Sequence, residues 1–158
     1  MSDFFAKTAS FFSAATGRFF REPDRKPLSQ CGALCWRQND LRKEVLLITS
    51  REAGRWIIPK GWPMKGKTLV QAAEQEAWEE AGVRGTANLG SMGCYRYVKR
   101  SGSPSAAEVD VTVFALQVFE ERNDFPEHGQ RNKLWTTPED AARLVENRGL
   151  SVLIASFA

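Results

Sequence analysis

The sequence is poor in the residues that most structural metal sites and disulfide frameworks require. Its 158 residues include one histidine, His128, and three cysteines, of which Cys31 and Cys35 form a CxxxC spacing with no second pair. This composition excludes a zinc site of the usual histidine and cysteine type, and the odd number of cysteines argues against a disulfide framework. We therefore expect free thiols and a cytoplasmic location.

Long hydrophobic runs are also absent. No window approaches the roughly 18 apolar residues that a membrane span requires, so no membrane partner is expected. With 42% hydrophobic and 26% charged residues, the composition is typical of a globular domain with a proper core. The formal net charge of +3 slightly favours anionic ligands but is too small to indicate nucleic acid as a partner.

The N-terminal segment contains phenylalanines in pairs, at positions 4 and 5, 11 and 12, and 19 and 20. At about 100° per residue, the first two pairs share one side of a helix with Thr8 and Ala15, which predicts an amphipathic helix. We expect this helix to dock on its own domain or to form a homodimer; binding to a membrane surface is the weaker alternative, because basic residues are few. The proline-containing REPDRKPLSQ predicts a linker, so residues 1–28 form helix and linker, and residues 29–158 form the main domain.

The main domain alternates short apolar runs with turn signals. This pattern predicts strands over residues 31–37, 44–50, 56–59, 90–98 and 108–120, the last two forming a hairpin across KRSGSPSAAE. Helices are predicted over residues 68–81, in TTPEDAARLV and in RGLSVLIASF. The sum is an α+β domain.

The predicted helix over residues 68–81 contains an acidic cluster. Glu76, Glu79 and Glu80 lie within roughly a 100° arc that continues the apolar face of the helix. Partly burying three negative charges is costly unless cations neutralise them, and no Lys or Arg occupies the neighbouring helical positions. A divalent cation resolves the conflict, and oxygen-only ligands indicate Mg²⁺ or Mn²⁺.

The loop KGWPMKGK leads directly into this helix. Its glycines, Gly61 and Gly66, allow close approach of the backbone, and Lys60, Lys65 and Lys67 place positive charge near the glutamates. The combination predicts a phosphate site, although a single lysine of this kind is more often an ordinary solvated surface charge.

The stretch from Gly61 to Val83 resembles a Nudix box, which is Gly, five residues, Glu, seven residues, Arg-Glu, an aliphatic residue, any residue, Glu-Glu, any residue, Gly and an aliphatic residue. Further segments (ALCWR, EVLLITSR, RWIIPKG, EEAGVRGT and RNKLW) are similar to the diphosphoinositol polyphosphate phosphohydrolase-like branch of the Nudix family. The resemblance implies a mixed β-sheet sandwiched between helices. The matching positions are Gly61, Glu76, Ala77, Glu79, Glu80, Gly82 and Val83.

The resemblance also implies a metal-dependent hydrolase. Water would attack phosphorus and cleave a phosphoanhydride in a nucleoside-diphosphate-linked or polyphosphorylated small molecule, either a diphosphoinositol polyphosphate or a dinucleoside polyphosphate. Glu76, Glu80 and the backbone near Gly61 would hold Mg²⁺ or Mn²⁺, and Glu79 would be the general base, with roles that the glutamates could exchange. The implied substrate-side residues are Ser50, Arg51, Lys60 and Arg131, to which the charge of Lys67 is added.

Two positions depart from the Nudix pattern. Lys67 replaces its first glutamate, and Gln75 replaces its arginine. Gln75 precedes Glu79 by one helical turn and can donate a hydrogen bond, though a neutral amide holds a carboxylate less strongly than a guanidinium. The alternative hypothesis is therefore a catalytically weak or inactive Nudix-fold module that binds ligands or regulates a partner.

Overall fold

The computed structural model describes residues 26–100 and 106–158. The predicted N-terminal amphipathic helix lies outside these described residues. The elements, in chain order, are β1 (Leu28–Asn39), β2 (Arg42–Thr49), β3 (Trp56–Ile57), β4 (Lys60–Gly61), α1 (Leu69–Ala81), β5 (Val83–Ala87), β6 (Gly93–Lys99), β7 (Ala107–Glu121), β8 (Lys133–Thr136), α2 (Pro138–Leu144) and α3 (Arg148–Ala155).

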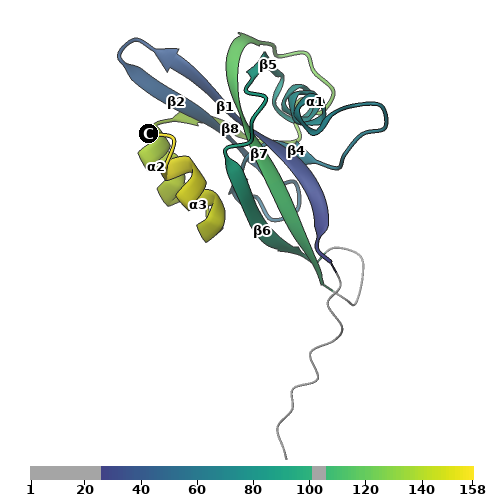
Figure 1. Ribbon diagram of the computed structural model, residues 1–158. Helices are drawn as coiled ribbons and strands as arrows, with labels where there is room; N and C mark the ends of the chain where they lie inside the picture. Colours follow the sequence, from purple (N-terminus) through teal and green to yellow (C-terminus); the bar gives the residue numbers. More distant parts are fainter. Residues whose placement is uncertain (1–25, 101–105) are drawn as a thin grey trace, which may run out of the picture.

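The strands form one mixed sheet around the long strands β1 and β7 (Figure 1). Along the main path the order is β3-β2-β1-β7-β5, while β4 pairs with β1, β6 with β7 and β8 with β2. The β1–β7 pairing is parallel and the other pairings are antiparallel. The predicted hairpin is present as β6 and β7, with Tyr97 opposite Val109.

Helices cover the two faces of this sheet. On one face, α1 packs small residues such as Ala73 and Ala77 against Cys31, Cys35 and Leu46. On the other face, α2 and α3 cover a second core, in which residues such as Leu150 and Ile154 join Leu34, Val45, Leu47 and Val111. Figure 1 shows α1 on one side of the sheet and α2 and α3 on the other. The α+β sandwich predicted from the sequence is confirmed.

Several strand boundaries differ from the prediction. The run WIIP does not form one strand, because pairing with β2 ends at Ile57 and pairing with β1 begins at Lys60. Strands β5 and β8 were not expected from the pattern. Strand β5 (VRGTA) has five residues, of which one is a glycine and only Val83 is large and apolar, so its sequence carries little strand signal. Strand β8 is only four residues long.

Caps at both ends fix the position of α1. The Thr68 side chain accepts a hydrogen bond from Gln71 N, and the Gln71 side chain accepts one from Thr68 N, which together form a capping box. At the other end Gly82 adopts a left-handed conformation, with φ of 69°. These caps set which residues of α1 point toward the sheet.

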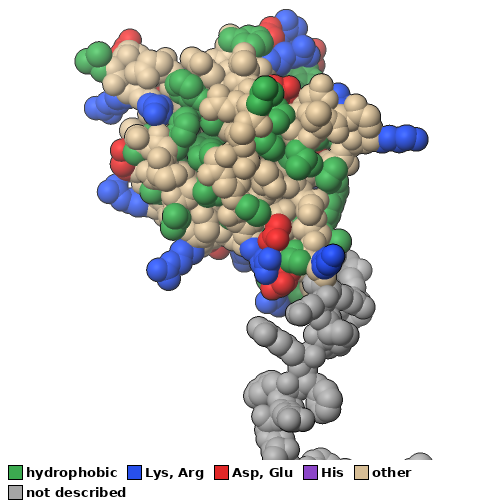
Figure 2. Space-filling view, in the orientation of Figure 1, with side chains coloured by type: hydrophobic (Ala, Val, Ile, Leu, Met, Phe, Trp, Pro, Cys, Tyr) green, Lys and Arg blue, Asp and Glu red, His purple; other side chains and the backbone are tan. Residues whose placement is uncertain are grey.

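As the composition predicts, the surface carries charged side chains and the cysteines are free thiols. Figure 2 shows charged side chains mostly at the margins of the visible face, with hydrophobic and neutral groups between them. Cys31 and Cys35 are buried free thiols, and Cys94 is an exposed one. No helix among residues 26–100 and 106–158 is long and apolar enough to cross a membrane.

Replacing Gly82 with alanine tests the C-terminal cap. An added methyl group would meet the Phe125 ring and, at 2.6 Å, the carbonyl oxygen of Arg122. Gly54 is the matched control, because its φ is +64° but nothing lies within 4 Å of an added methyl group. We expect Gly54→Ala to lower the free energy of unfolding by about 1 kcal/mol, and Gly82→Ala by at least about 1 kcal/mol more. Urea unfolding measures both; equal losses would contradict the described packing.

Candidate functional site

The site begins at the contact between β4 and α1. Gly61 is buried in β4, and the Glu76 carboxylate of α1 lies directly over its Cα, in the space that any side chain at position 61 would occupy. A residue larger than glycine would displace the carboxylate. The glycine and the first glutamate of the acidic cluster are therefore one structural unit, although they lie in different elements.

Glu80 is the buried carboxylate of the cluster, with 8% of the residue exposed. Its Oε1 accepts a hydrogen bond from Arg131 Nη2 at 2.8 Å, and its Oε2 accepts one from the backbone N–H of Lys60 at 3.1 Å. Arg131 Nη1 also donates to the carbonyl oxygen of Thr49, at 3.1 Å. Glu80 therefore ties α1 both to β4 and to the segment before β8.

Arg131 is buried, whereas an arginine that only contacts phosphate would be open to solvent. Its side chain is 6% exposed and forms the ion pair with Glu80. No Lys or Arg occupies the helical positions next to the glutamates, but this cation lies 51 residues further along the chain. A protein cation therefore balances one of the three negative charges before any metal is considered.

Glu79 lies beside the position where the sequence departs from the Nudix pattern. Its Oε1 accepts a hydrogen bond from Gln75 Nε2 at 2.6 Å. Its backbone oxygen accepts a hydrogen bond from the N–H of Glu127 at 3.0 Å. Gln75 thus holds one oxygen of the carboxylate, and the loop before β8 is attached to the last turns of α1.

Glu127 is a fourth carboxylate at the site, and sequence reasoning missed it. Its Oε1 lies 3.6 Å from Arg131 Nη2 and 3.3 Å from Arg51 Nη1. The sequence signal was its position four residues before Arg131, in the polar segment between β7 and β8. Its negative charge contributes to the raised pKa values of Glu76 and Glu80.

The electrostatics show where positive charge is lacking. Burial, together with the charges of Glu80, Glu79 and Glu127, raises the pKa of Glu76 to about 7. Burial also raises the pKa of Glu80, but the charge of Arg131 and the hydrogen bond from Lys60 oppose that rise. Among the described residues, donors reach Glu79 and Glu80, whereas none reaches Glu76. Glu76 is therefore the carboxylate with the least compensation.

The carboxylate oxygens at this site fit a divalent cation that keeps part of its own hydration shell. In the part of the chain that is described, no group of three His, Cys, Asp or Glu side chains is arranged to hold a metal ion by itself. A hard cation such as Mg²⁺ needs only one or two protein carboxylates and fills its remaining positions with water and phosphate oxygens. The uncompensated Glu76 carboxylate, with Glu80 close by, meets that requirement.

The other residues predicted for the site lie in two places. Ser50 Oγ accepts a hydrogen bond from Arg55 N at 3.1 Å and stabilises the turn after β2, and the side chain of Arg51 is 61% exposed. Lys60 is half-buried, and its backbone binds Glu80. These three lie on the side of Glu80 and Glu127.

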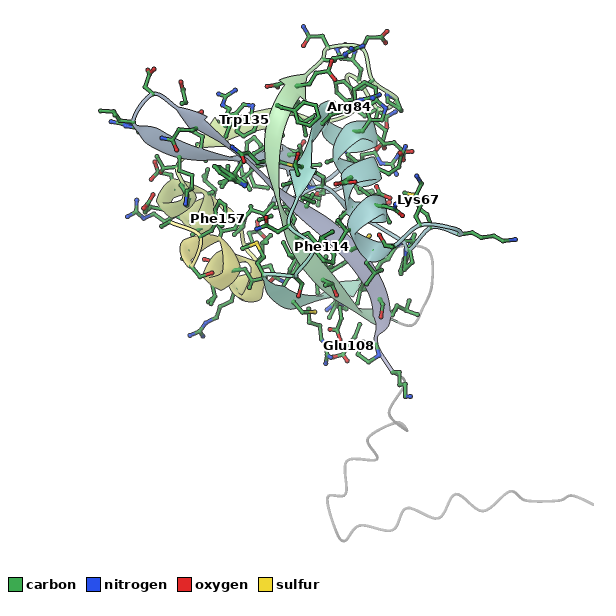
Figure 3. All side chains as sticks on the ribbon, turned by 45° about the horizontal axis from the view of Figure 1, so that its top comes forward. Lys67, Arg84, Glu108, Phe114, Trp135 and Phe157 are labelled. Carbon is green, nitrogen blue, oxygen red and sulfur yellow. The ribbon has the colours of Figure 1, made fainter. Side chains whose placement is uncertain are left out.

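Lys67 lies elsewhere, on the outer side of α1 (Figure 3). It borders an open depression of about 590 Å³ that also includes Gln75. None of the three clustered glutamates lines it. Its other lining residues are Gly66, Gln71, Glu74, Trp78, Arg84, Gly85 and Phe119.

The fold and the site together define an α+β domain in which the acidic helix α1 follows the loop after Gly61, and in which Glu80 of this helix pairs with the buried Arg131. This combination has a known counterpart: residues 29–156 match the NUDIX domain, and the chain belongs to the NUDIX domain family.

Curated relatives agree with this assignment. Nudix hydrolase 12, mitochondrial, from Arabidopsis thaliana is 34% identical over 120 residues, which cover 72% of this chain and 58% of that protein. Nudix hydrolase 13, mitochondrial, from the same plant is 30% identical over 122 residues, covering 72% and 59%. The chain therefore spans less than two thirds of the length of these relatives.

Solved structures share the fold. A NUDIX hydrolase from Nitrosomonas europaea superposes with a TM-score of 0.65 at 19% identity, covering 84% of this chain and 88% of that one. A C. elegans Ap4A hydrolase in a binary complex gives a TM-score of 0.62 at 22% identity, covering 82% and 94%. At these identities the likeness concerns the fold alone.

The pKa of Glu76 predicts how the stability of the metal-free protein depends on pH. Because its pKa rises from 4.5 to about 7 on folding, the folded state keeps a proton that the unfolded state loses between these values. The contribution of Glu76 to stability therefore falls as the pH rises through this window. We expect the melting temperature in EDTA to fall across it, and Glu76→Gln to flatten part of that slope.

Glu74→Gln is the control for this measurement. Glu74 lies on the same helix, but its carboxylate accepts a hydrogen bond from Ala87 N at 3.4 Å, outside the cluster. This variant should keep the wild-type slope in thermal melts. An unchanged slope in Glu76→Gln would contradict the assignment.

The ion pair between Arg131 and Glu80 yields a second prediction. Removing one partner of a buried pair leaves the other charge uncompensated, so Arg131→Ala should lower the free energy of unfolding by about 3 kcal/mol. Arg51→Ala is the control, because this exposed arginine pairs with Glu127 at the surface and should contribute less than about 1 kcal/mol. Urea unfolding distinguishes them. Similar losses for both would show that Arg131 has no special structural role.

Proposed function

We propose that this chain is a metal-dependent pyrophosphohydrolase that cleaves a phosphoanhydride bond in a polyphosphorylated small molecule by water attack on phosphorus. The observation that carries this proposal is the Glu76 carboxylate, which lies over Gly61 with no donor among the described residues and with other carboxylates around it. Maintaining that arrangement costs free energy unless a cation binds there. Membership of the NUDIX domain family supports the reaction class.

In the proposed mechanism the glutamates have different tasks. Glu76 and Glu80, with the backbone at Gly61, would hold Mg²⁺ or Mn²⁺, a Lewis acid that neutralises phosphate oxygens and activates water when bound. Glu79 would accept a proton from the attacking water. Gln75 holds one oxygen of Glu79 at 2.6 Å and leaves the other for this task. Arg131 keeps Glu80 in place from the opposite side.

The proposed substrate carries several phosphates. Lys60 and Arg51 lie on the side of the site where a substrate would approach Glu80 and Glu127. The structural neighbour from C. elegans is named an Ap4A hydrolase, which supports a dinucleoside polyphosphate. The similarity of RWIIPKG and RNKLW to the diphosphoinositol polyphosphate phosphohydrolase-like branch supports the other candidate, a diphosphoinositol polyphosphate.

The non-catalytic alternative rests on two observations. First, Lys67 and Gln75 do not carry the charges that the Nudix pattern has at these two positions. Second, Lys67 lies on the outer side of α1, beside a depression that none of the three clustered glutamates lines. A ligand-binding or regulatory module would bind polyphosphates but would not hydrolyse them. Such a module would keep its affinity when Glu79 is changed to glutamine.

Location and assembly stay predictions from the sequence. We propose a cytoplasmic protein, and a homodimer formed through the N-terminal helix. Light scattering of the full chain and of a variant lacking residues 2–20 tests the second point, since an unchanged mass would exclude a dimer built on that segment.

A substrate panel tests the proposed activity. Purified protein with Mg²⁺ or Mn²⁺ should hydrolyse at least one nucleoside, dinucleoside or inositol polyphosphate, and anion-exchange chromatography should detect the shortened products. Glu79→Gln should lower kcat by about 10²- to 10⁴-fold, because the general base is lost. Gln75→Arg should raise kcat, because a guanidinium holds Glu79 with a charge-assisted hydrogen bond. Tight binding of the whole panel with no turnover would favour the module instead.

A further inference from the structure

Strand β6 places two side chains, Tyr97 and Lys99, on the sheet face that α2 and α3 cover, since Tyr97 packs against the core of that face. Along a strand, successive side chains alternate between faces, so Tyr97 and Lys99 share one face while Arg96 points to the other. Arg96 is neutralised there by Asp110, to which its Nε and Nη2 donate at 2.6 and 3.0 Å. Of the basic residues on β6, Lys99 is therefore the one available to this face.

Strand β4 and the residue that follows it supply the side chains that contact β6. Lys60 Nζ lies 4.7 Å from the centroid of the Tyr97 ring and 3.5 Å from its hydroxyl oxygen. Lys99 Nζ lies 5.1 Å from the centroid of the Trp62 ring. Lys60 of β4 thus contacts the Tyr97 ring of β6, and Lys99 of β6 contacts the ring of Trp62, which directly follows β4. We call Lys60, Trp62, Tyr97 and Lys99 the β4–β6 platform.

The charges of this platform are not balanced within the described protein. Among residues 26–100 and 106–158, neither Lys60 nor Lys99 forms an ion pair, and an aromatic ring attracts a cation without neutralising it. The Glu80 carboxylate, to which the Lys60 backbone N–H donates, is already paired with Arg131. An anion bound by Lys60 and Lys99 would therefore supply the negative charge that these lysines lack.

The aromatic and amide groups fix the lysines in place. The Tyr97 hydroxyl donates to Gln30 Oε1 at 2.8 Å, so the ring under Lys60 is tied to β1. Trp62 is 41% exposed and Lys99 is half-buried, so the contact between them lies at the surface. Because lysine is flexible, such contacts reduce the entropy that it loses on binding a ligand.

The platform begins at the carboxylate cluster. The backbone N–H of Lys60 binds Glu80, while the Lys60 side chain extends to β6. One residue therefore links the acidic cluster, where a scissile anhydride would lie, to the unbalanced positive charge. A ligand that spans both needs anionic groups at some distance from the bond that is cleaved.

We propose that the β4–β6 platform binds a phosphoryl group beyond the scissile phosphoanhydride, with Lys60 and Lys99 as its contacts and Trp62 and Tyr97 as positioning residues. The preferred substrates then carry at least one phosphate in addition to the two that share the scissile bond. This inference rests on the proposed function, because it assumes that the anhydride lies at the glutamates.

The test compares two inorganic probes, pyrophosphate and tetraphosphate, by isothermal titration calorimetry with Mg²⁺. All proteins contain Glu79→Gln, so that binding is measured without turnover. The parent protein should bind tetraphosphate more tightly than pyrophosphate. Lys99→Gln should weaken tetraphosphate binding by about tenfold and leave pyrophosphate binding unchanged, and Lys99→Arg should restore it.

Arg42→Gln is the matched control, because it removes one positive charge from the exposed first residue of β2 and should change neither affinity. The proposal is overturned if the parent protein does not prefer tetraphosphate, if Lys99→Gln weakens both probes alike or neither, or if Arg42→Gln has the same effect. A protein that is inactive in the substrate panel can still bind tetraphosphate more tightly than pyrophosphate. Failure of the proposed function and failure of the platform are therefore distinguishable.

Discussion

The structure of the site depends on the contact between the backbone of β4 and the carboxylates of α1. Glu76 lies over Gly61, where no side chain fits. The backbone N–H of the preceding residue, Lys60, donates a hydrogen bond to Glu80. The capping box at Thr68 and the left-handed Gly82 fix the helix along its axis, and small alanines let it approach the sheet closely. A shift of α1 by one residue would remove both carboxylates from β4.

Around this contact the charges are balanced unevenly, and that unevenness indicates the chemistry. Glu80 has a buried arginine and a backbone donor, and Glu79 has an amide donor. Glu76 has no donor among the described residues, and Glu127 adds a fourth negative charge nearby. At the β4–β6 platform the excess charge is positive, because Lys60 and Lys99 form no ion pairs within the described protein. A cation held by the glutamates and a polyphosphate over the lysines would satisfy both sides.

Local patterns in the sequence predicted much of the fold. Periodicity and caps gave α1, and alternation gave β6 and β7 as a hairpin. Strand β5 was missed because its five residues include Gly85 and only one large apolar residue, Val83. Local patterns could not predict the long-range partners, because Arg131 meets Glu80 only after the sheet has formed. The structural role of Arg131 therefore does not appear in any local pattern. The same holds for Glu127, whose backbone joins the end of α1.

The central claim is that Glu76, placed over Gly61, binds a divalent cation, and a Mn²⁺ titration followed by electron paramagnetic resonance tests it most directly. The wild-type chain should bind Mn²⁺, Glu76→Gln should weaken that affinity by about a hundredfold, and Glu74→Gln, on the same helix but bonded to Ala87, should leave it unchanged. Equal affinities for wild type and Glu76→Gln would contradict the account.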